Sequence, residues 1–221
     1  MLRKPALRYR KRPLQARARV TVDAVLQATE RVLIRRGVDG LTTKEVARLA
    51  GVSIGTLYQY FPDKHALCAA VLERENEEIL RALQAALPDV ARAPLPVLVR
   101  RVVETIHRRN LLQDALCRAL IPLKAHLLTQ TTADAGMAPF IGLVRSLIEA
   151  RRAELRPGNA DLMAYVVVHS MEAVLYMSAL GGAGSVPPEV VVEEITRLVL
   201  GYLLPDAEEK GSLSGKARAR A

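Results

Sequence analysis

The chain has 221 residues, of which 50% are hydrophobic and 4% aromatic, and its net charge is +9 at pH 7. This length suits one or two domains with a buried core. Ala, Leu, Val, Arg and Glu dominate, which predicts an all-α fold. The basic N-terminus lacks an apolar core, so we expect no signal peptide. Two cysteines, Cys68 and Cys117, lie in helical patterns and favour a reduced, cytoplasmic protein over a disulfide scaffold.

The charge is distributed unevenly along the chain. Residues 1–64 hold 14 Lys and Arg against 5 Asp and Glu, hence +9, whereas residues 65–221 hold 18 of each kind, hence zero. The whole basic surplus therefore lies in the first third of the chain. This asymmetry predicts a polyanionic partner for that segment and none for the rest.

The N-terminal segment divides into a basic arm and a first helix. Residues 1–20 carry eight Lys and Arg residues and no apolar period, so we predict a flexible arm. The arm either lies along phosphates and enters a minor groove or only adds solubility. A helix is predicted from its cap at Thr21 to Arg36, with Gly37 as the residue that ends it.

Residues 41–64, LTTKEVARLAGVSIGTLYQYFPDK, predict two short helices joined by a tight turn. Thr42 and Glu45 have capping-box spacing, in which the hydroxyl accepts an amide proton and the carboxylate reaches back. Gly51 lies where a helix ends in a left-handed residue, and Ser53 is placed to cap the second helix. This spacing is that of a helix-turn-helix.

The second helix of this motif, residues 54–61, turns Leu57 inward and a polar face outward. With a rotation of about 100° per residue, the outward residues are Gly55, Thr56, Tyr58 and Gln59. Such a face suits the major groove of DNA. A helical hairpin with a solvated face has the same spacing, so spacing alone leaves both interpretations open.

These residues also resemble the DNA-binding core of the tetracycline-repressor (TetR) family of bacterial transcriptional regulators. The matching positions, within about residues 21–72, are Gly51-Val52-Ser53, Thr56-Leu57-Tyr58, Tyr60-Phe61 and Lys64. The resemblance implies that Lys44, Thr56, Tyr58, Tyr60 and Lys64 lie near DNA, the last three chiefly on its backbone. Side-chain chemistry makes Gln59 a further candidate for base reading and Ile54 a candidate for contact with a thymine methyl group. Ser53 and Gly55 are candidate contacts because of their position at the start of the second helix.

Helical periodicity continues through the rest of the chain. The sequence predicts helices at residues 64–86, 95–108, 111–128, 137–155, 160–180 and 188–204. The domain organisation that we expect is a basic arm at 1–20, a three-helix helix-turn-helix DNA-binding domain at 21–66, a helical ligand-sensing and dimerisation domain at 67–205, and a disordered tail at 206–221.

The last two helices are too apolar for the surface of a monomer. Residues 162–180 have the length of a membrane span, but His169, Ser170 and Glu172 interrupt them, which favours a buried interface helix and no membrane partner. We expect a homodimer with a four-helix interface. The resemblance also implies that the last two helices form the dimerisation element. Burial inside one subunit is the alternative. The predicted interface residues of the last helix are Val191, Ile195, Leu198 and Tyr202.

The middle helices mix soft or polar residues with apolar ones, which suits a cavity for an apolar ligand. The candidate ligand-binding residues are Cys117, His126, Phe140, Tyr165, His169 and Tyr176. Such residues at helical spacing are also ordinary core. The sequence has no nucleotide-binding loop, catalytic frame or metal-ligand spacing. We therefore expect no catalytic residue, no metal and no cofactor.

The sequence thus predicts a ligand-responsive transcriptional regulator and not an enzyme. It is expected to repress by binding a palindromic double-stranded DNA operator as a dimer, with a small-molecule inducer that shifts the population of its binding state. Two alternatives remain, a non-inducible DNA-binding or architectural protein and an enzyme with a DNA-binding head. The sequence does not identify the inducer, the operator or the target genes.

Overall fold

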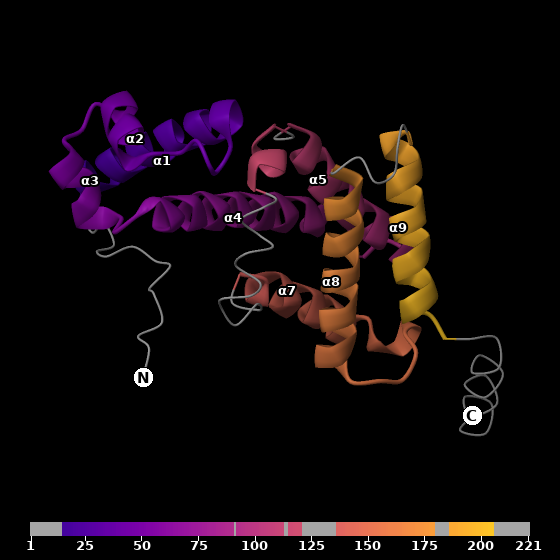
Figure 1. Ribbon diagram of the computed structural model, residues 1–221. Coiled ribbons are helices and arrows are strands. Elements are labelled where there is room, and N and C mark those ends of the chain that lie inside the picture. The colour runs from indigo at the N-terminus through magenta and orange to yellow at the C-terminus, as the bar shows by residue number, and fades with distance from the viewer. Residues whose placement is uncertain (1–14, 91, 113–114, 121–135, 180–185, 206–221) are drawn as a thin grey trace, which may run out of the picture. The chain divides into compact units, whose positions relative to one another are not determined.

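The computed structural model describes residues 15–90, 92–112, 115–120, 136–179 and 186–205. Within these ranges the chain is helical and contains no strand, which confirms the all-α prediction (Figure 1). The helices are α1 (Ala16–Arg36), α2 (Thr43–Ala50), α3 (Ile54–Tyr60), α4 (Lys64–Val90), α5 (Leu95–Leu112), α7 (Ala138–Ala150), α8 (Ala160–Ala179) and α9 (Pro188–Leu203), with a 3₁₀ turn at Arg152–Glu154. Residues 115–120 are helical as well.

The chain forms two compact units. The N-terminal unit comprises Met1–Ile79 and Asn110–Ala133, and the C-terminal unit comprises Leu80–Arg109 and Asp134–Ala221. The division falls inside the 27-residue helix α4, which ends at Val90 and holds Pro88 in its last turn. Pro88 has no amide hydrogen to bond the carbonyl four residues before it, and the helix ends two residues after it.

The N-terminal unit has one continuous apolar core. Helix α1 supplies Val25 and Leu33, which are fully buried, and helix α4 supplies Leu67 and Val71. Leu116 of the helical segment 115–120 packs into the same core. Helix α4 begins with a side-chain cap, because Asp63 accepts the amide proton of Ala66 at 2.8 Å, as N-cap residues do.

The predicted start of the first helix is wrong. Helix α1 begins at Ala16, five residues before Thr21, and its N-cap Gln15 makes no side-chain capping bond. The hydroxyl of Thr21 instead donates to the carbonyl of Arg17 at 3.1 Å within the helix. Ala and Arg are strong helix formers, so residues 16–20 extend the helix. Only residues 1–14 of the predicted arm lie outside the described residues.

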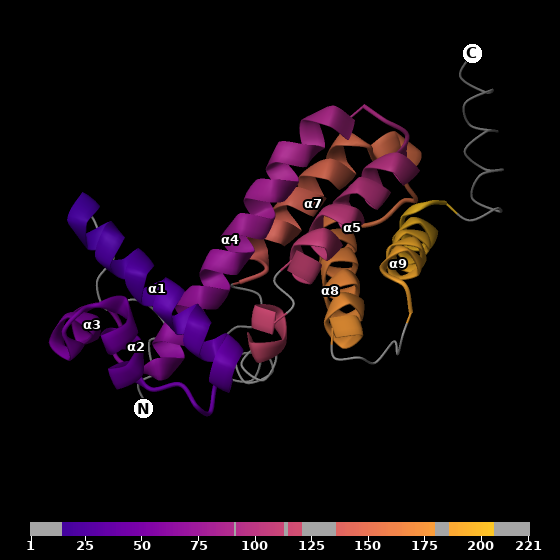
Figure 2. The same ribbon diagram turned by 90° about the horizontal axis from the view of Figure 1, so that it is seen from above.

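The C-terminal unit is a bundle in which α8 packs against both α7 and α9. Its core joins the buried faces of these helices to that of α5, with Val103, Ala164 and Ile195 at its centre. Figure 2 shows the two helices α5 and α7 from above. The apolar periodicity predicted for these segments is therefore the packing surface of this unit.

Arg156, in the loop before α8, binds the C-terminal end of α9. Its guanidinium lies 4.4 Å from the ring centroid of Tyr202, a cation–π distance. Its Nε donates to the carbonyl of Tyr202 at 2.6 Å, and its backbone amide donates to the carbonyl of Leu203 at 3.0 Å. These bonds satisfy carbonyl groups that a helix terminus leaves without partners.

Helix α8 is apolar on more than one face. Its stretch Ala160–Ser178 is long and apolar enough to cross a membrane by length and composition, and 33% of that stretch is buried inside the chain. Leu162, Tyr165 and Met177 are exposed by 60%, 45% and 53%. These three side chains are apolar and exposed to solvent in the subunit.

Candidate DNA-binding surface

The turn between α2 and α3 has the backbone geometry that the sequence predicts. Gly51 adopts a left-handed conformation, with φ 68° and ψ 27°, which costs a glycine little because it has no Cβ. The amide of Val52 donates to the carbonyl of Ala47 at 3.0 Å. Ala47 is 3% exposed, and its small side chain lets the two helices approach closely. The turn therefore fixes the crossing of α2 and α3.

Two side chains cap the helices of this motif. Thr42 Oγ1 accepts the amide proton of Glu45 at 3.3 Å. The reciprocal half of the predicted capping box does not form, because the carboxylate of Glu45 pairs with Arg36 at 2.7 Å and so ties α2 to the end of α1. Ser53 Oγ accepts the amide proton of Thr56 at 3.0 Å. Both helices thus begin at a capping residue.

Helix α3 presents a mostly polar surface, with Leu57 on its inward side. Leu57 and the adjoining Phe61 are fully buried. The predicted contact residues Ser53, Gly55 and Gln59 are exposed, and Thr56 and Tyr60 are half-buried. Ile54 and Tyr58 are large side chains that remain 42% and 41% exposed. The exposed residues of α3 form one surface that can meet a groove.

Other predicted contacts flank this surface from neighbouring elements. Lys44, on α2, is exposed. Tyr58 Oη lies 3.1 Å from the hydroxyl of Thr43, also on α2. Lys64, in the first turn of α4, is half-buried, and its ammonium donates to the carbonyl of Val38 at 3.4 Å. We give the name recognition surface to the group of predicted contact residues, which are Lys44, Ser53, Ile54, Gly55, Thr56, Tyr58, Gln59, Tyr60 and Lys64. Sequence reasoning missed Thr43, whose partner lies 15 positions away.

Comparison with family models shows to which protein family this chain belongs. The family described as "Bacterial regulatory proteins, tetR family" matches residues 25–71, and the family described as "Tetracyclin repressor-like, C-terminal domain" matches residues 94–203. The chain belongs to the tetR family. The first match covers α2, the turn, α3 and the start of α4, and the second covers most of the C-terminal unit. The predicted family, and the prediction of a transcriptional regulator instead of an enzyme, are confirmed.

Curated relatives of this tetR-family chain include two transcriptional repressors. KstR of Mycolicibacterium smegmatis is 33% identical over 99 residues, which are 44% of this chain and 48% of KstR. BepR of Brucella suis biovar 1 is 37% identical over 98 residues, 43% of this chain and 46% of BepR. The chain thus matches about half the length of these relatives.

A solved structure supports the fold of the tetR-family chain across both units. The structure described as a "SmeT-Triclosan complex" has a TM-score of 0.61 at 18% identity, and the match covers 85% of this chain and 93% of that one. Similarity at this level of identity concerns the fold.

Four of the predicted ligand residues of this tetR-family chain lie in the described part of the C-terminal unit, namely Phe140, Tyr165, His169 and Tyr176. Cys117 belongs to the N-terminal unit, and His126 lies outside the described residues. Phe140 is 9% exposed and Tyr165 45% exposed, while His169 and Tyr176, also in the C-terminal unit, are half-buried. Tyr165 and His169 stack against each other, with ring centroids 4.3 Å apart.

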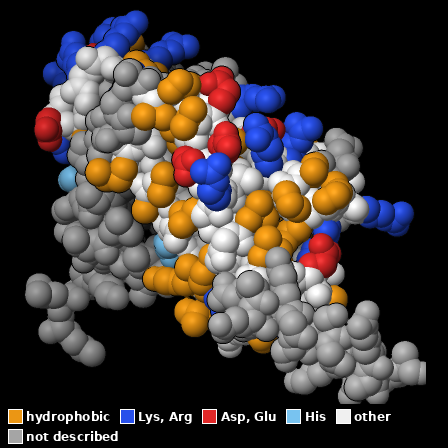
Figure 3. Space-filling model, turned by 90° about the vertical axis from the view of Figure 1, so that its right-hand side faces the viewer, with side chains coloured by type: hydrophobic (Ala, Val, Ile, Leu, Met, Phe, Trp, Pro, Cys, Tyr) orange, Lys and Arg blue, Asp and Glu red, His pale blue; other side chains and the backbone are white. Residues whose placement is uncertain are grey.

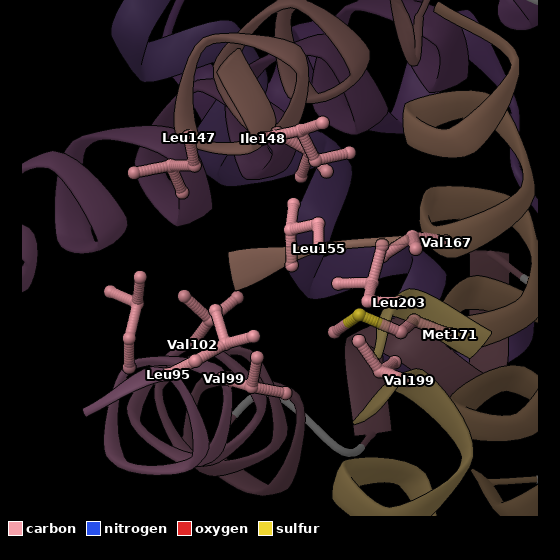
Figure 4. Close-up of a pocket in the computed structure, with 12 residues that line it drawn as sticks. Leu95, Val99, Val102, Leu147, Ile148, Leu155, Val167, Met171, Val199 and Leu203 are labelled. Carbon is pink, nitrogen blue, oxygen red and sulfur yellow. The ribbon is translucent and has the colours of Figure 1, made fainter. Parts of the chain in front are cut away.

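The C-terminal unit contains a different cavity, of about 50 Å³. Its lining comes from α5, α7, α8, α9 and Leu155, and the labelled side chains converge on one space (Figure 4). It is lined by Leu95, Leu98, Val99, Val102, Val144, Leu147, Ile148, Leu155, Val167, Met171, Val199 and Leu203. No predicted ligand residue belongs to this set. Sequence reasoning searched for polar and aromatic side chains, and aliphatic ones give no signal that separates a cavity from a core.

The structure revises the predicted dimer face of α9. Val191 and Ile195 are 8% and 1% exposed because they belong to the core of their own subunit, and Tyr202 is half-buried beside Arg156. Leu198 is 49% exposed and Val190 43% exposed. Figure 3, which views the molecule from the side that carries α9, shows hydrophobic side chains at the surface among charged ones. The exposed side of α9 is therefore the side that carries Leu198.

Burial shifts the pKa of two ionisable side chains in the described part of the tetR-family chain, Cys68 and His107. Burial raises the pKa of the Cys68 thiol to about 11, so this thiol stays protonated and unreactive at neutral pH. His107, on α5, is 9% exposed, and neither ring nitrogen has a hydrogen-bond partner among the described residues. Burial lowers the pKa of His107, and Glu189 opposes the shift. Among the described residues, no group of three or more His, Cys, Asp or Glu is placed to hold a metal ion.

Proposed function

We propose that this chain is a cytoplasmic, sequence-specific transcriptional repressor that binds a palindromic operator as a homodimer. The observation that carries the proposal is the recognition surface, in which a capped helix with a polar outer face follows a left-handed glycine turn. A helix of this kind enters the major groove. The basic surplus of residues 1–64 supplies attraction to phosphates.

Each side chain of the recognition surface has a proposed role. Gln59 and Thr56 hydrogen-bond base edges, and Ile54 contacts a thymine methyl group. Lys44, Tyr58, Tyr60 and Lys64 contact the phosphate backbone, which positions the helix without reading sequence. Ser53 and Gly55 allow the start of α3 to approach the DNA closely. The roles of Gln59 and Ile54 follow from side-chain chemistry, and the backbone roles of Tyr58, Tyr60 and Lys64 are those that the family resemblance implies.

The proposed dimer interface lies on the exposed apolar sides of α8 and α9. Leu162, Met177 and Leu198 are each about half exposed or more, at 60%, 53% and 49%. Helices of two subunits joined across a twofold axis would cover this surface with a four-helix interface. A twofold dimer has two recognition helices, so the operator half-sites should be one DNA turn, about 34–36 Å, apart or a multiple of it.

The proposed repressor also responds to a small-molecule inducer. The structural neighbour SmeT is described as a complex with triclosan, which supports the proposal that this chain binds a small molecule. An inducer acts only through different affinities for the DNA-bound and free conformations.

Mapping the bound sites across the source genome tests this function. The expected result is a small set of sites that share an inverted repeat, one of them beside the gene of this protein or its neighbours. A synthetic duplex with that repeat should bind the full chain in fluorescence anisotropy, and a duplex with one half-site scrambled should bind at least tenfold more weakly. Binding without sequence preference would instead identify an architectural DNA-binding protein.

A further inference from the structure

We propose that the cavity of the C-terminal unit binds the unbranched alkyl segment of an amphiphilic molecule. The inference names the ligand class for the inducer response proposed above, and its regulatory consequence rests on that proposal. Alkyl binding itself is a property of the C-terminal unit and is measured without DNA.

The chemistry of the lining carries the assignment. Every lining side chain is Leu, Val, Ile or Met, and none offers a hydrogen-bond donor or a strong acceptor. A buried water molecule needs two to four polar partners, so these side chains give water no favourable position. Side chains that line such a space also lack the dispersion contacts of a packed core. An apolar group that enters the cavity leaves water and gains these dispersion contacts.

The size of the cavity selects a chain over a ring. Its volume of about 50 Å³ is roughly a third of the 150 Å³ cavity that holds benzene in a well-studied case. A short methylene chain is narrower than a ring and enters with smaller shifts of the lining. Met171, on α8, is flexible and lets the cavity lengthen as a chain enters. The polar end of the ligand stays outside the cavity, because a buried hydroxyl or carboxylate would have no partner.

The position of the cavity explains how occupancy would be transmitted. Val167 and Met171 line it from the buried side of α8, and Val199 and Leu203 line it from α9. Leu198, next to Val199, is on the exposed side of α9. A chain that displaces either helix therefore shifts the proposed dimer surface. This gives the ligand a different affinity for two arrangements of the dimer.

Calorimetric titration of the DNA-free, full-length protein with straight-chain 1-alkanols tests the inference. Affinity should rise about fourfold for each added methylene and stop rising at a definite chain length. 1,6-Hexanediol should bind about tenfold more weakly than 1-hexanol, because its second hydroxyl would be buried without a partner. Affinity that does not depend on chain length, or benzene binding more tightly than 1-hexanol, would overturn the assignment.

Variants locate the binding at this cavity. Val102→Leu adds a carbon to the lining and should shorten the limiting chain length, whereas Leu147→Ala enlarges the cavity and should lengthen it. Val97→Leu is the matched control, because Val97 lies on the same helix, is 48% exposed and does not line the cavity. Circular dichroism verifies that each variant is folded. Equal limiting chain lengths in Val102→Leu, Leu147→Ala and the wild type would refute the site.

Operator binding is measured separately on the same proteins. If alkanols fail to bind while the operator duplex binds normally, the alkyl assignment is refuted and the repressor proposal stands. If alkanols bind with the expected chain-length limit while no sequence-specific duplex binds, the repressor proposal is refuted and the alkyl site stands.

Discussion

The hydroxyl of Thr43 and the hydroxyl of Tyr58 lie 3.1 Å apart, so a hydrogen bond joins the first residue of α2 to the middle of α3. Tyr58 is 41% exposed, and without a partner its ring would sample several rotamers. The bond to Thr43 restricts the ring to one orientation, and we expect the proposed phosphate contact to use that orientation. Preorganisation of this kind reduces the entropic cost of binding.

Thr43→Val removes this hydrogen bond with little change in side-chain shape. Operator affinity should fall severalfold, while the free energy of unfolding changes by about 1 kcal/mol or less, the net value of one hydrogen bond. A double-mutant cycle with Tyr58→Phe, followed by fluorescence anisotropy, should give a coupling of at least about 0.5 kcal/mol in DNA binding. Thr105→Val, on α5 in the C-terminal unit, is the control and should not affect affinity. Strictly additive effects would contradict the positioning role.

The two glycines of the motif should respond oppositely to alanine. Gly51→Ala places a Cβ on a left-handed residue with φ 68° and should destabilise the protein by about 1–2 kcal/mol. Gly55 has no positive φ, and an added Cβ would meet only Ser53 Oγ at 3.7 Å. Gly55→Ala should therefore stabilise α3 by about 0.5–1 kcal/mol and still weaken operator binding, because the new methyl group faces the DNA. Urea unfolding and anisotropy together measure both effects. A Gly55→Ala protein with unchanged affinity would exclude close approach of DNA to this position.

Lys44 should contribute one phosphate contact. Lys44→Ala should lower the slope of log affinity against log salt concentration by about 0.9 and weaken all sequences similarly. Lys64→Ala should have the same effect if its ammonium leaves the carbonyl of Val38, to which it donates at 3.4 Å. Arg101→Ala, an exposed substitution in the C-terminal unit, should leave the slope unchanged. An unaltered slope in Lys44→Ala would remove that residue from the recognition surface.

The exposed side of α9 predicts how the dimer can be separated. Leu198→Asp should leave the subunit folded and raise the dimer dissociation constant at least tenfold, because each buried polar group costs about 1–3 kcal/mol. Ile195→Asp should unfold the C-terminal unit instead, since Ile195 is 1% exposed within its own subunit. Val97→Asp, at a site 48% exposed on α5, is the control that should remain dimeric. Sedimentation velocity and circular dichroism distinguish the three outcomes, and a tight Leu198→Asp dimer would place the interface elsewhere.

His107 should make the stability of the protein decrease in mild acid. Burial holds its pKa below the 6.5 of the unfolded chain, against the opposing effect of Glu189. The unfolded state therefore binds the proton more readily than the folded state. The contribution of neutral His107 to stability is complete above about pH 6.5 and is lost as the pH falls below that value. Urea unfolding of the wild type and of His107→Leu between pH 5 and 8 should show the steeper decrease in the wild type. Parallel pH profiles would show that His107 is not responsible.

Local signals made the helix-turn-helix predictable. Thr42, Gly51 and Ser53 each act within a few residues of the chain, so their spacing is enough to predict their bonds. The partner of Glu45 was not predictable in this way. Its carboxylate has a choice between the nearby backbone and Arg36, and the approach of α1 to α2 decides that choice. The start of α1 was wrong for a related reason, since Thr21 is a good cap that stronger helix formers before it override.

The C-terminal unit shows what periodicity leaves undecided. Helix α9 is apolar on two sides, and the sequence does not say which side faces the core of the subunit. The structure turns Val191 and Ile195 inward and Leu198 outward. The cavity was missed because its lining consists of ordinary core residues. A space among helices depends on how side chains from four elements fit together, and no single helix records that fit.

The fastening of α9 by Arg156 has a consequence for local motion. Terminal turns of helices usually open first, and their amide protons exchange quickly with solvent. Because Arg156 bonds the carbonyls of Tyr202 and Leu203, the last turn of α9 can open only when the loop before α8 moves with it. Amides near Tyr202 should then exchange as slowly as those in the middle of the helix, and those of the loop should exchange at the same rate.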